Sequence, residues 1–162
     1  MARTLPRVRR TRSGAFQLRL EPEEREVFGH LIEELRGLLG AEDPVLERLF
    51  PPGYADDPEL ARQYRDLVHS DLTTQRLASL QVVEDTLEAK QLDEEQMGTW
   101  LTVVNDLRLV LGTRLDVTED MAEDGIPDDD PRAPAFAVYG FLTWLEWQVV
   151  EVLAQVLPEE TG

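Results

Sequence analysis

The sequence predicts a mainly α-helical protein: a bundle of about four main helices and one short helix, with a minor strand near the N-terminus. Three observations indicate this class. Apolar residues recur every three or four positions over several long stretches, which is the period of a helix with one buried face. The chain has 162 residues, enough for one domain with a sizeable core. Only residues 15–20 alternate apolar and polar side chains as a half-buried strand does.

The first 13 residues differ from the rest of the chain in charge. They hold five arginines and no acidic residue, so we expect residues 1–13 to be a basic, disordered arm. A single helical domain at 14–162 would follow. Its first element is the strand "AFQLRL". A lone strand needs a partner, and "RLDV" at residues 114–117 is the candidate.

The first three helices are predicted from the residues at their ends as well as from the spacing of their apolar residues. Proline suits the first turn of a helix and glycine its end, so we expect one helix from Pro22 to Gly40. A short helix at 45–50 lies within a proline-rich segment. A long helix then runs from Pro58 to about Lys90, without glycine or an internal proline.

Two further helices complete the predicted bundle. Asp93 and Gln96 have the spacing of a capping box, which places a helix start there, and the helix would end near Gly112. Residues 118–135 are acidic and contain prolines, so we expect a loop. The last helix spans about 135–157 and is apolar over far more than one face.

Charge and cysteine content restrict the kind of partner. The net charge is −17, and such an acidic body repels phosphate backbones and anionic membranes, so basic or apolar protein surfaces are the expected partners. The chain has no cysteine, which excludes a disulfide or thiol switch within it. The N-terminal residues lack the apolar segment of a secretory signal, and Glu146 and Glu151 interrupt the apolar last helix. We therefore expect a cytoplasmic protein without membrane contact.

The stretch "NDLRLVLGTRL", residues 105–115, places two arginines in an apolar run. A guanidinium on a buried helix face must be paired, because removing its partner costs about 3–5 kcal/mol. For Arg108 the candidate partner is Asp71, on the apolar side of the long helix, with neighbouring polar residues as further options. Arg114 lies where a cation stabilises a helix C-terminus. The resulting candidate cluster, which either holds two helices in register or receives a partner, is Asp71, Asn105, Asp106, Arg108 and Arg114.

The aromatic residues of the last helix suggest a second kind of site. A helix that is apolar on most sides is either central in a bundle or shared with another chain. Tryptophan and tyrosine are enriched in protein interfaces. The sequence thus favours a homodimer, and the candidate interface residues are Tyr139, Phe141, Trp144 and Trp147.

Motifs for catalysis, metals and cofactors are not recognisable. Neither of the two histidines has a second ligand at zinc-site spacing, and "EDGIPDDDP" does not fit a calcium loop: counted from Asp120, the third position is Ala122 and the twelfth is Pro131. We therefore expect no enzyme, no metal and no cofactor. A rival interpretation is a nucleic-acid-associated transcription factor that binds through its basic arm, with Arg7, Arg9, Arg10 and Arg12 as candidate contacts.

Three stretches carry a resemblance to a known family: "FQLRLEPEEREVFGHLIEELRGLL", "LERLFPPGYADDPELARQYRDL" and "WLTVVNDLRLVLGTRLDV". They resemble an actinobacterial family of a domain of unknown function that includes the oxidative-stress regulator AosR, with genes often near that of the ClpS adaptor. The resemblance implies a regulatory protein of stress-linked transcription that acts through protein contacts, with a sigma factor or another transcription protein as candidate partner. AosR is under thiol control, which this cysteine-free chain cannot share.

Overall fold

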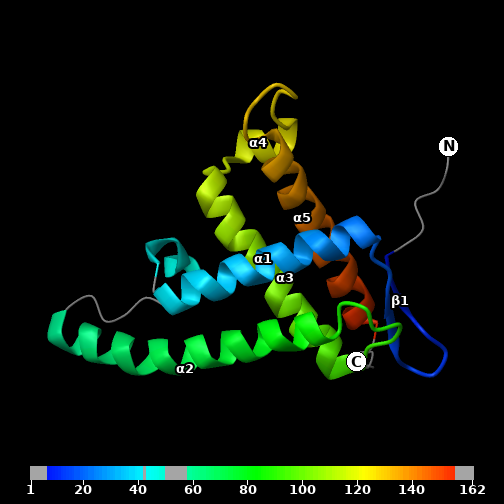
Figure 1. The fold of residues 1–162 in the computed structure, drawn as a ribbon, viewed down its shortest axis with the longest axis horizontal. Coiled ribbons are helices and arrows are strands. Elements are labelled where there is room, and N and C mark those ends of the chain that lie inside the picture. Colours follow the sequence, from blue (N-terminus) through cyan, green and yellow to red (C-terminus); the bar gives the residue numbers. More distant parts are fainter. Residues whose placement is uncertain (1–6, 42, 50–57, 156–162) are drawn as a thin grey trace, which may run out of the picture.

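The structure is a computed structural model that describes residues 7–41, 43–49 and 58–155. The predicted mainly α-helical class with a minor N-terminal sheet is confirmed (Figure 1). The elements in chain order are β1 (Val8–Arg10), β2 (Phe16–Leu18), α1 (Pro22–Ala41), the 3-10 helix η1 (Pro44–Leu49), α2 (Pro58–Asp85), α3 (Glu94–Leu115), α4 (Glu119–Asp124) and α5 (Ala133–Ala154).

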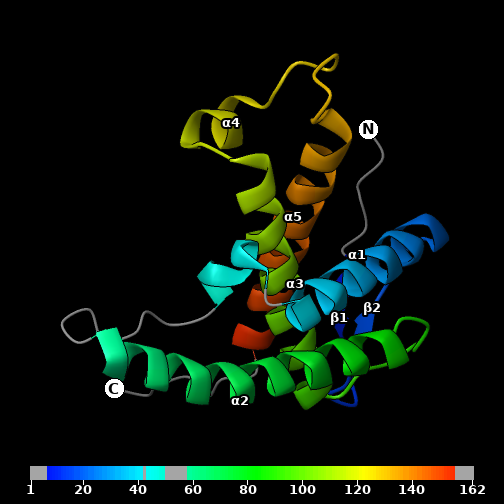
Figure 2. The same cartoon turned by 60° about the vertical axis from the view of Figure 1, so that its left-hand side comes forward.

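Helix α3 is the centre of the arrangement. It packs most extensively against α5, and it also contacts α2, η1 and α1. Figure 2 shows α3 and α5 side by side, with α4 at one end of the pair and α2 crossing near the other. The N-terminal end of α2 extends past the other helices in both views, and Leu67 within it is 72% exposed. Only the later part of α2 therefore contributes to the core.

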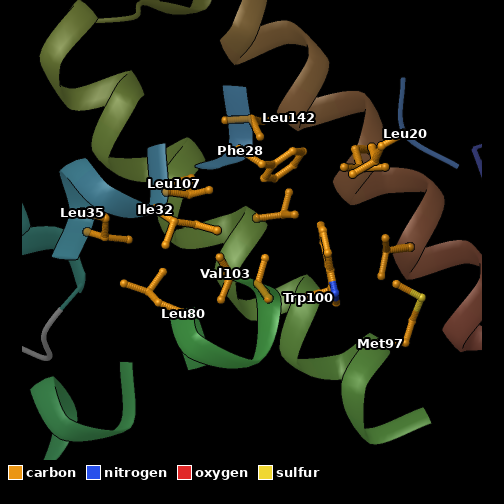
Figure 3. Close-up of a cluster of buried hydrophobic side chains, with 14 of the residues drawn as sticks. Leu20, Phe28, Ile32, Leu35, Leu80, Met97, Trp100, Val103, Leu107 and Leu142 are labelled. Carbon is orange, nitrogen blue, oxygen red and sulfur yellow. The ribbon is translucent and has the colours of Figure 1, made fainter. Parts of the chain in front are cut away.

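The core lies where α1, α2, α3 and α5 meet (Figure 3). Trp100 is fully buried at its centre and contacts the edge of Phe28, with ring centroids 5.4 Å apart. The indole Nε1 donates a hydrogen bond to Thr86 Oγ1 at 2.8 Å, which satisfies its one polar atom. The surrounding buried residues include Ile32, Leu35, Leu80, Met97, Val103, Leu107 and Leu142.

The predicted capping box of α3 is confirmed. The Asp93 carboxylate accepts from the Gln96 backbone at 2.7 Å, and the Gln96 side chain accepts from the Asp93 backbone at 3.0 Å. At its other end the helix runs on beyond Gly112 and stops at Asp116, whose φ of 51° is left-handed. Residues 114–117 were thus wrongly predicted as a strand, because the helical hydrogen bonds extend through Leu115.

The partner of the predicted strand is β1, not residues 114–117. Val8 pairs with Leu18 in an antiparallel hairpin, and Phe16 also forms a bridge with Leu92. Residues 7–13, which we expected in a disordered arm, form the first strand and the turn of this hairpin. The reason is burial: Val8 is 3% exposed and Phe16 0%. Residues 1–6 of the predicted arm lie outside the described residues.

Two side-chain hydrogen bonds hold the hairpin against α5. The Gln148 Oε1 atom accepts from the backbone N–H groups of Arg7 at 2.9 Å and Val8 at 3.3 Å. Gln148 is itself buried, so these bonds satisfy a polar group that would otherwise be unpaired in the interior. The hairpin is therefore part of the folded body.

The acidic segment 118–135 was predicted to be a loop, and this is wrong in part. It contains the short helix α4, whose N-cap residue Thr118 accepts a hydrogen bond from the Met121 backbone at 3.3 Å. Gly125 ends the helix with a φ of 76°. Across the described ranges, no helix is both long and apolar enough to cross a membrane.

Candidate functional site

A buried ion pair joins α2 to α3. The Arg76 guanidinium donates to the carboxylate of Asp106, and Asp106 is only 4% exposed. A second nitrogen of Arg76 donates to the Leu49 carbonyl at 2.6 Å, which adds η1 to the same cluster. Burial raises the pKa of Asp106, and the positive charge of Arg76 opposes this shift. The three groups fix the position of α2 and η1 against α3.

A second ion pair joins α3 to α5 on another side of α3. Arg108 Nη1 lies 3.5 Å from the Glu146 carboxylate, and Arg108 Nε donates to Thr143 Oγ1 at 2.9 Å. The guanidinium also lies over the Tyr139 ring, 5.5 Å from its centroid. A Cβ atom at Gly112 would lie 3.0 Å from Tyr139 Cε2, so the glycine allows this close approach of the two helices.

The predicted polar cluster is thus divided among three neighbours of α3. Asp106 contacts α2, Arg108 contacts α5, and Arg114 lies 3.5 Å from Glu34 of α1 in an exposed pair. Asn105 is half-buried and enters none of these ion pairs. Asp71 was wrongly predicted as the partner of Arg108, because it lies on the exposed side of α2.

Two members of these ion pairs were missed from the sequence. Arg76 precedes the buried Leu80 by four residues, so helical spacing alone places it on the inward face of α2. Glu146 follows the buried Leu145 within the apolar last helix, where its charge also argues against a membrane span. The available signal was the spacing to Leu80 for Arg76, and an isolated charge within an apolar stretch for Glu146.

The candidate interface residues of α5 differ in exposure. Tyr139 stacks on Phe136 at 6.1 Å, and Phe141 contacts the edge of the Phe28 ring at 6.3 Å, so both pack within the chain. Trp144 is half-buried beside Phe141. Trp147 is 59% exposed, and Val150 one turn further is 46% exposed. The exposed apolar surface of α5 therefore centres on Trp147.

The candidate arginines of the N-terminal hairpin also differ. Arg7 lies 3.1 Å from the Glu24 carboxylate and 3.4 Å from that of Glu21, so its charge is neutralised within the chain. Arg9 donates to Gln17 across the hairpin at 2.6 Å. Arg9, Arg10 and Arg12 are all exposed.

Among the described residues, no three His, Cys, Asp or Glu side chains lie together as metal ligands would.

One further pair of charges orders the start of α5: Arg132 donates to Asp130 at 3.0 Å, and this hydrogen bond lowers the pKa of Asp130. Arg132 also reaches the Leu115 carbonyl at the end of α3, at 3.4 Å.

Sequence comparison places this helical scaffold in a family. The chain matches the family described as "Domain of unknown function (DUF2017)" over residues 5–153 and belongs to it. It is similar to the "Putative oxidative stress regulator AosR" of Mycobacterium leprae, with 27% identity over 91% of this chain and 86% of the relative. It is also 30% identical to the "Oxidative stress regulator AosR" of Mycobacterium bovis and of Mycobacterium tuberculosis, over 68% of this chain and 58% of each relative. No solved structure matches it significantly.

Proposed function

We propose that this protein is a non-enzymatic, cytoplasmic regulator of stress-linked transcription that acts through protein contacts as a homodimer. Its partner would be a sigma factor or another transcription protein. The family relationship supports the regulatory class, because the relatives are named oxidative stress regulators. A thiol switch within this chain is not part of the proposal, since the sequence has no cysteine.

The observation that carries the proposal is the exposed apolar surface on α5. Trp147 and Val150 lie one turn apart and are both about half exposed, in a chain whose net charge is −17. Exposure of a large apolar side chain to water is unfavourable, and tryptophan is enriched in protein interfaces. The acidic remainder of the surface favours basic groups on the transcription partner.

The ion pairs of α3 contribute as a scaffold in this proposal. Arg76 with Asp106 and Arg108 with Glu146 hold α2 and α5 at fixed positions on α3. Arg108 also neutralises the acidic residue nearest to Trp147 on α5. The charges in the apolar helices thus support a rigid surface for contact with another protein.

Deleting the gene in the organism that encodes the protein tests the regulatory function. Under peroxide stress we expect a defined group of transcripts to lose its response, and the wild-type gene should restore it. In parallel, the purified chain should co-elute with a sigma factor or another component of the transcription machinery. An identical transcript response in both strains, with no co-elution, would contradict the proposal.

The rival function, binding of nucleic acid, is favoured by one observation: Arg9, Arg10 and Arg12 are exposed together on the hairpin. Truncating residues 1–12 is a poor test, because it removes β1 and uncovers the buried Phe16. Replacing the three arginines with glutamine keeps the hairpin and removes the charge. If the wild type binds DNA and the variant loses that affinity with a reduced salt dependence, the rival function is correct. If the wild type binds no DNA at moderate salt, the rival is excluded.

A further inference from the structure

An uncharged seam runs along the whole length of α5. Its residues are spaced alternately three and four positions apart, which is the heptad repeat of two helices packed side by side. The seam, called the α5 seam below, consists of Ala133, Phe136, Gly140, Thr143, Trp147, Val150 and Ala154. The whole of α5 holds only two charged residues, Glu146 and Glu151, and neither lies in the seam.

The described residues leave most of this seam uncovered. Within the described part of the chain, the main contacts of α5 are with α3 and β1, which cover its other sides. Gly140, Thr143, Trp147, Val150 and Ala154 are all exposed, and Ala133 and Phe136 are half-buried. Figure 1 shows α5 running beside α3 along the body. A helix that is apolar on nearly every side but packed on only some of them has a face suited to another chain.

Two glycines on the facing helices illustrate the difference between covered and uncovered sides. Gly112 of α3 faces the interior, where a Cβ atom would lie 3.0 Å from the Tyr139 ring. At Gly140 of α5, a Cβ atom would meet nothing within 4 Å. Gly140 therefore leaves room beside α5 for the close approach of a second chain.

The sizes of the seam residues select an antiparallel arrangement of two copies. A two-fold axis beside α5, between Thr143 and Trp144, places Trp147 of one copy level with Gly140 of the other. The same axis places Ala154 level with Ala133. Large side chains then lie on small ones. A parallel arrangement would instead set Trp147 against itself and leave a gap at Gly140.

The charges beside the seam select the same arrangement. Glu146 and Glu151 occupy the two flanking rows of the heptad. In a parallel pair, the flanking rows of the two helices interact, and Glu146 of one copy would face Glu151 of the other. In the antiparallel pair, Glu151 lies beside Ala137 and Glu146 beside Tyr139, so no acidic side chains meet. The opposed helix dipoles also favour this direction.

We propose that two copies of this protein associate through antiparallel packing of their α5 seams, with Trp147 of each copy seated on Gly140 of the other. This inference rests on the proposed homodimer and adds the surface, the direction and the register. The Arg108–Glu146 pair lies beside the seam and neutralises one of its two flanking acidic residues. With Glu146 paired, the flank of the α5 seam carries less unpaired negative charge, which lowers the repulsion between two copies.

Solution mass tests the surface. Each chain has a mass of 18.5 kDa, and sedimentation of the full chain should give twice that mass. Gly140→Leu should give the mass of one chain with unchanged helix content, because a Cβ atom there has no neighbour within 4 Å and the position is exposed. Gly37→Leu on α1 is the matched control, since its Cβ position is also open, and it should remain a dimer.

The outcomes separate the inference from the proposed function. If Gly140→Leu keeps the mass of two chains, the proposed homodimer is supported, but its proposed interface at the α5 seam is wrong. If the wild type has the mass of one chain, both the homodimer and the seam are wrong, and the face is left to another protein or to the terminal residues of this chain. The transcript response described above is measured independently of either result.

Cross-linking tests the direction and register, because an introduced cysteine is the only one in the chain. A short bismaleimide should join two copies of Thr143→Cys, which lie at the axis. Ala154→Cys alone should give no cross-link, because the antiparallel register separates the two positions by about 30 Å. Mixed with Ala133→Cys, it should cross-link. Efficient linking of Ala154→Cys to itself would indicate a parallel pair and overturn the inference.

Discussion

The guanidinium of Arg76 on α2 and the carboxylate of Asp106 on α3 form an ion pair inside the protein. Asp106 is 4% exposed, and Arg76 also donates to the Leu49 carbonyl of η1. Two elements distant in sequence thus depend on one carboxylate of α3. A buried ion pair of this kind makes the relative position of the helices specific, and breaking it leaves a charge without its partner.

Asp106→Ala should lower the free energy of unfolding by about 3 kcal/mol, because Arg76 loses its buried counter-charge. Asp71→Ala is the matched control: it removes the same side chain from the exposed side of α2, so we expect a change of less than about 0.5 kcal/mol. Urea denaturation measures both. Equal effects of the two substitutions would contradict the arrangement.

The stability should depend on pH through Asp106. Burial raises the pKa of its carboxyl in the folded state above the ordinary value of 3.8, so between these two values the folded protein binds more protons than the unfolded one. The contribution of this group to stability is therefore gained as pH falls through the raised pKa and lost as pH rises through it. Asp106→Asn cannot titrate there. The stability of the wild type minus that of Asp106→Asn should increase from neutral pH toward pH 4, and a decrease would contradict the shift.

Arg108 and Glu146 should be energetically coupled. They lie 3.5 Å apart with about a quarter of each side chain exposed, so a double-mutant cycle with Arg108→Met and Glu146→Gln should give about 0.5–1 kcal/mol. High salt should reduce this coupling. Asp71→Asn in place of Glu146→Gln provides the control, for which we expect no coupling to Arg108.

The buried indole of Trp100 should depend on the hydroxyl of Thr86. Thr86→Val keeps the volume but leaves Trp100 Nε1 without its acceptor, which should cost about 1–3 kcal/mol of stability. Thr86→Ser retains the hydroxyl and should cost less. Thermal unfolding compares the two variants, and an equal loss in both would indicate that packing of the methyl group matters more than the hydrogen bond.

The helices could be predicted because their start signals and their buried residues coincide. Pro22, Pro58 and the Asp93–Gln96 capping box each begin a helix where expected. The N-terminal hairpin could not, because Val8 lies among arginines and its burial depends on Gln148, which is 140 residues away. Local charge there indicates a solvated arm, and only the tertiary contact makes it a strand.

The sequence could predict that Arg108 pairs with a carboxylate, but not which residue provides it. A guanidinium within the apolar helix α3 correctly required a carboxylate on a neighbouring helix, and Glu146 of α5 provides it. Sequence periodicity favours Asp71, because it gives the long helix one buried face along its whole length. Its apolar residues form that face only near Leu80 and Val83, while Leu67 points to solvent. Which neighbour faces Arg108 depends on helix packing, which sequence periodicity does not specify.

The proposed homodimer depends on the exposed face of α5 being a protein interface. The measurement that tests it most directly is the solution mass of the wild type and of Trp147→Ala over a dilution series. We predict two chains for the wild type and, at the same concentrations, one folded chain of 18.5 kDa for the variant. A wild type that remains a single chain at every concentration, with the variant indistinguishable from it, would contradict the account.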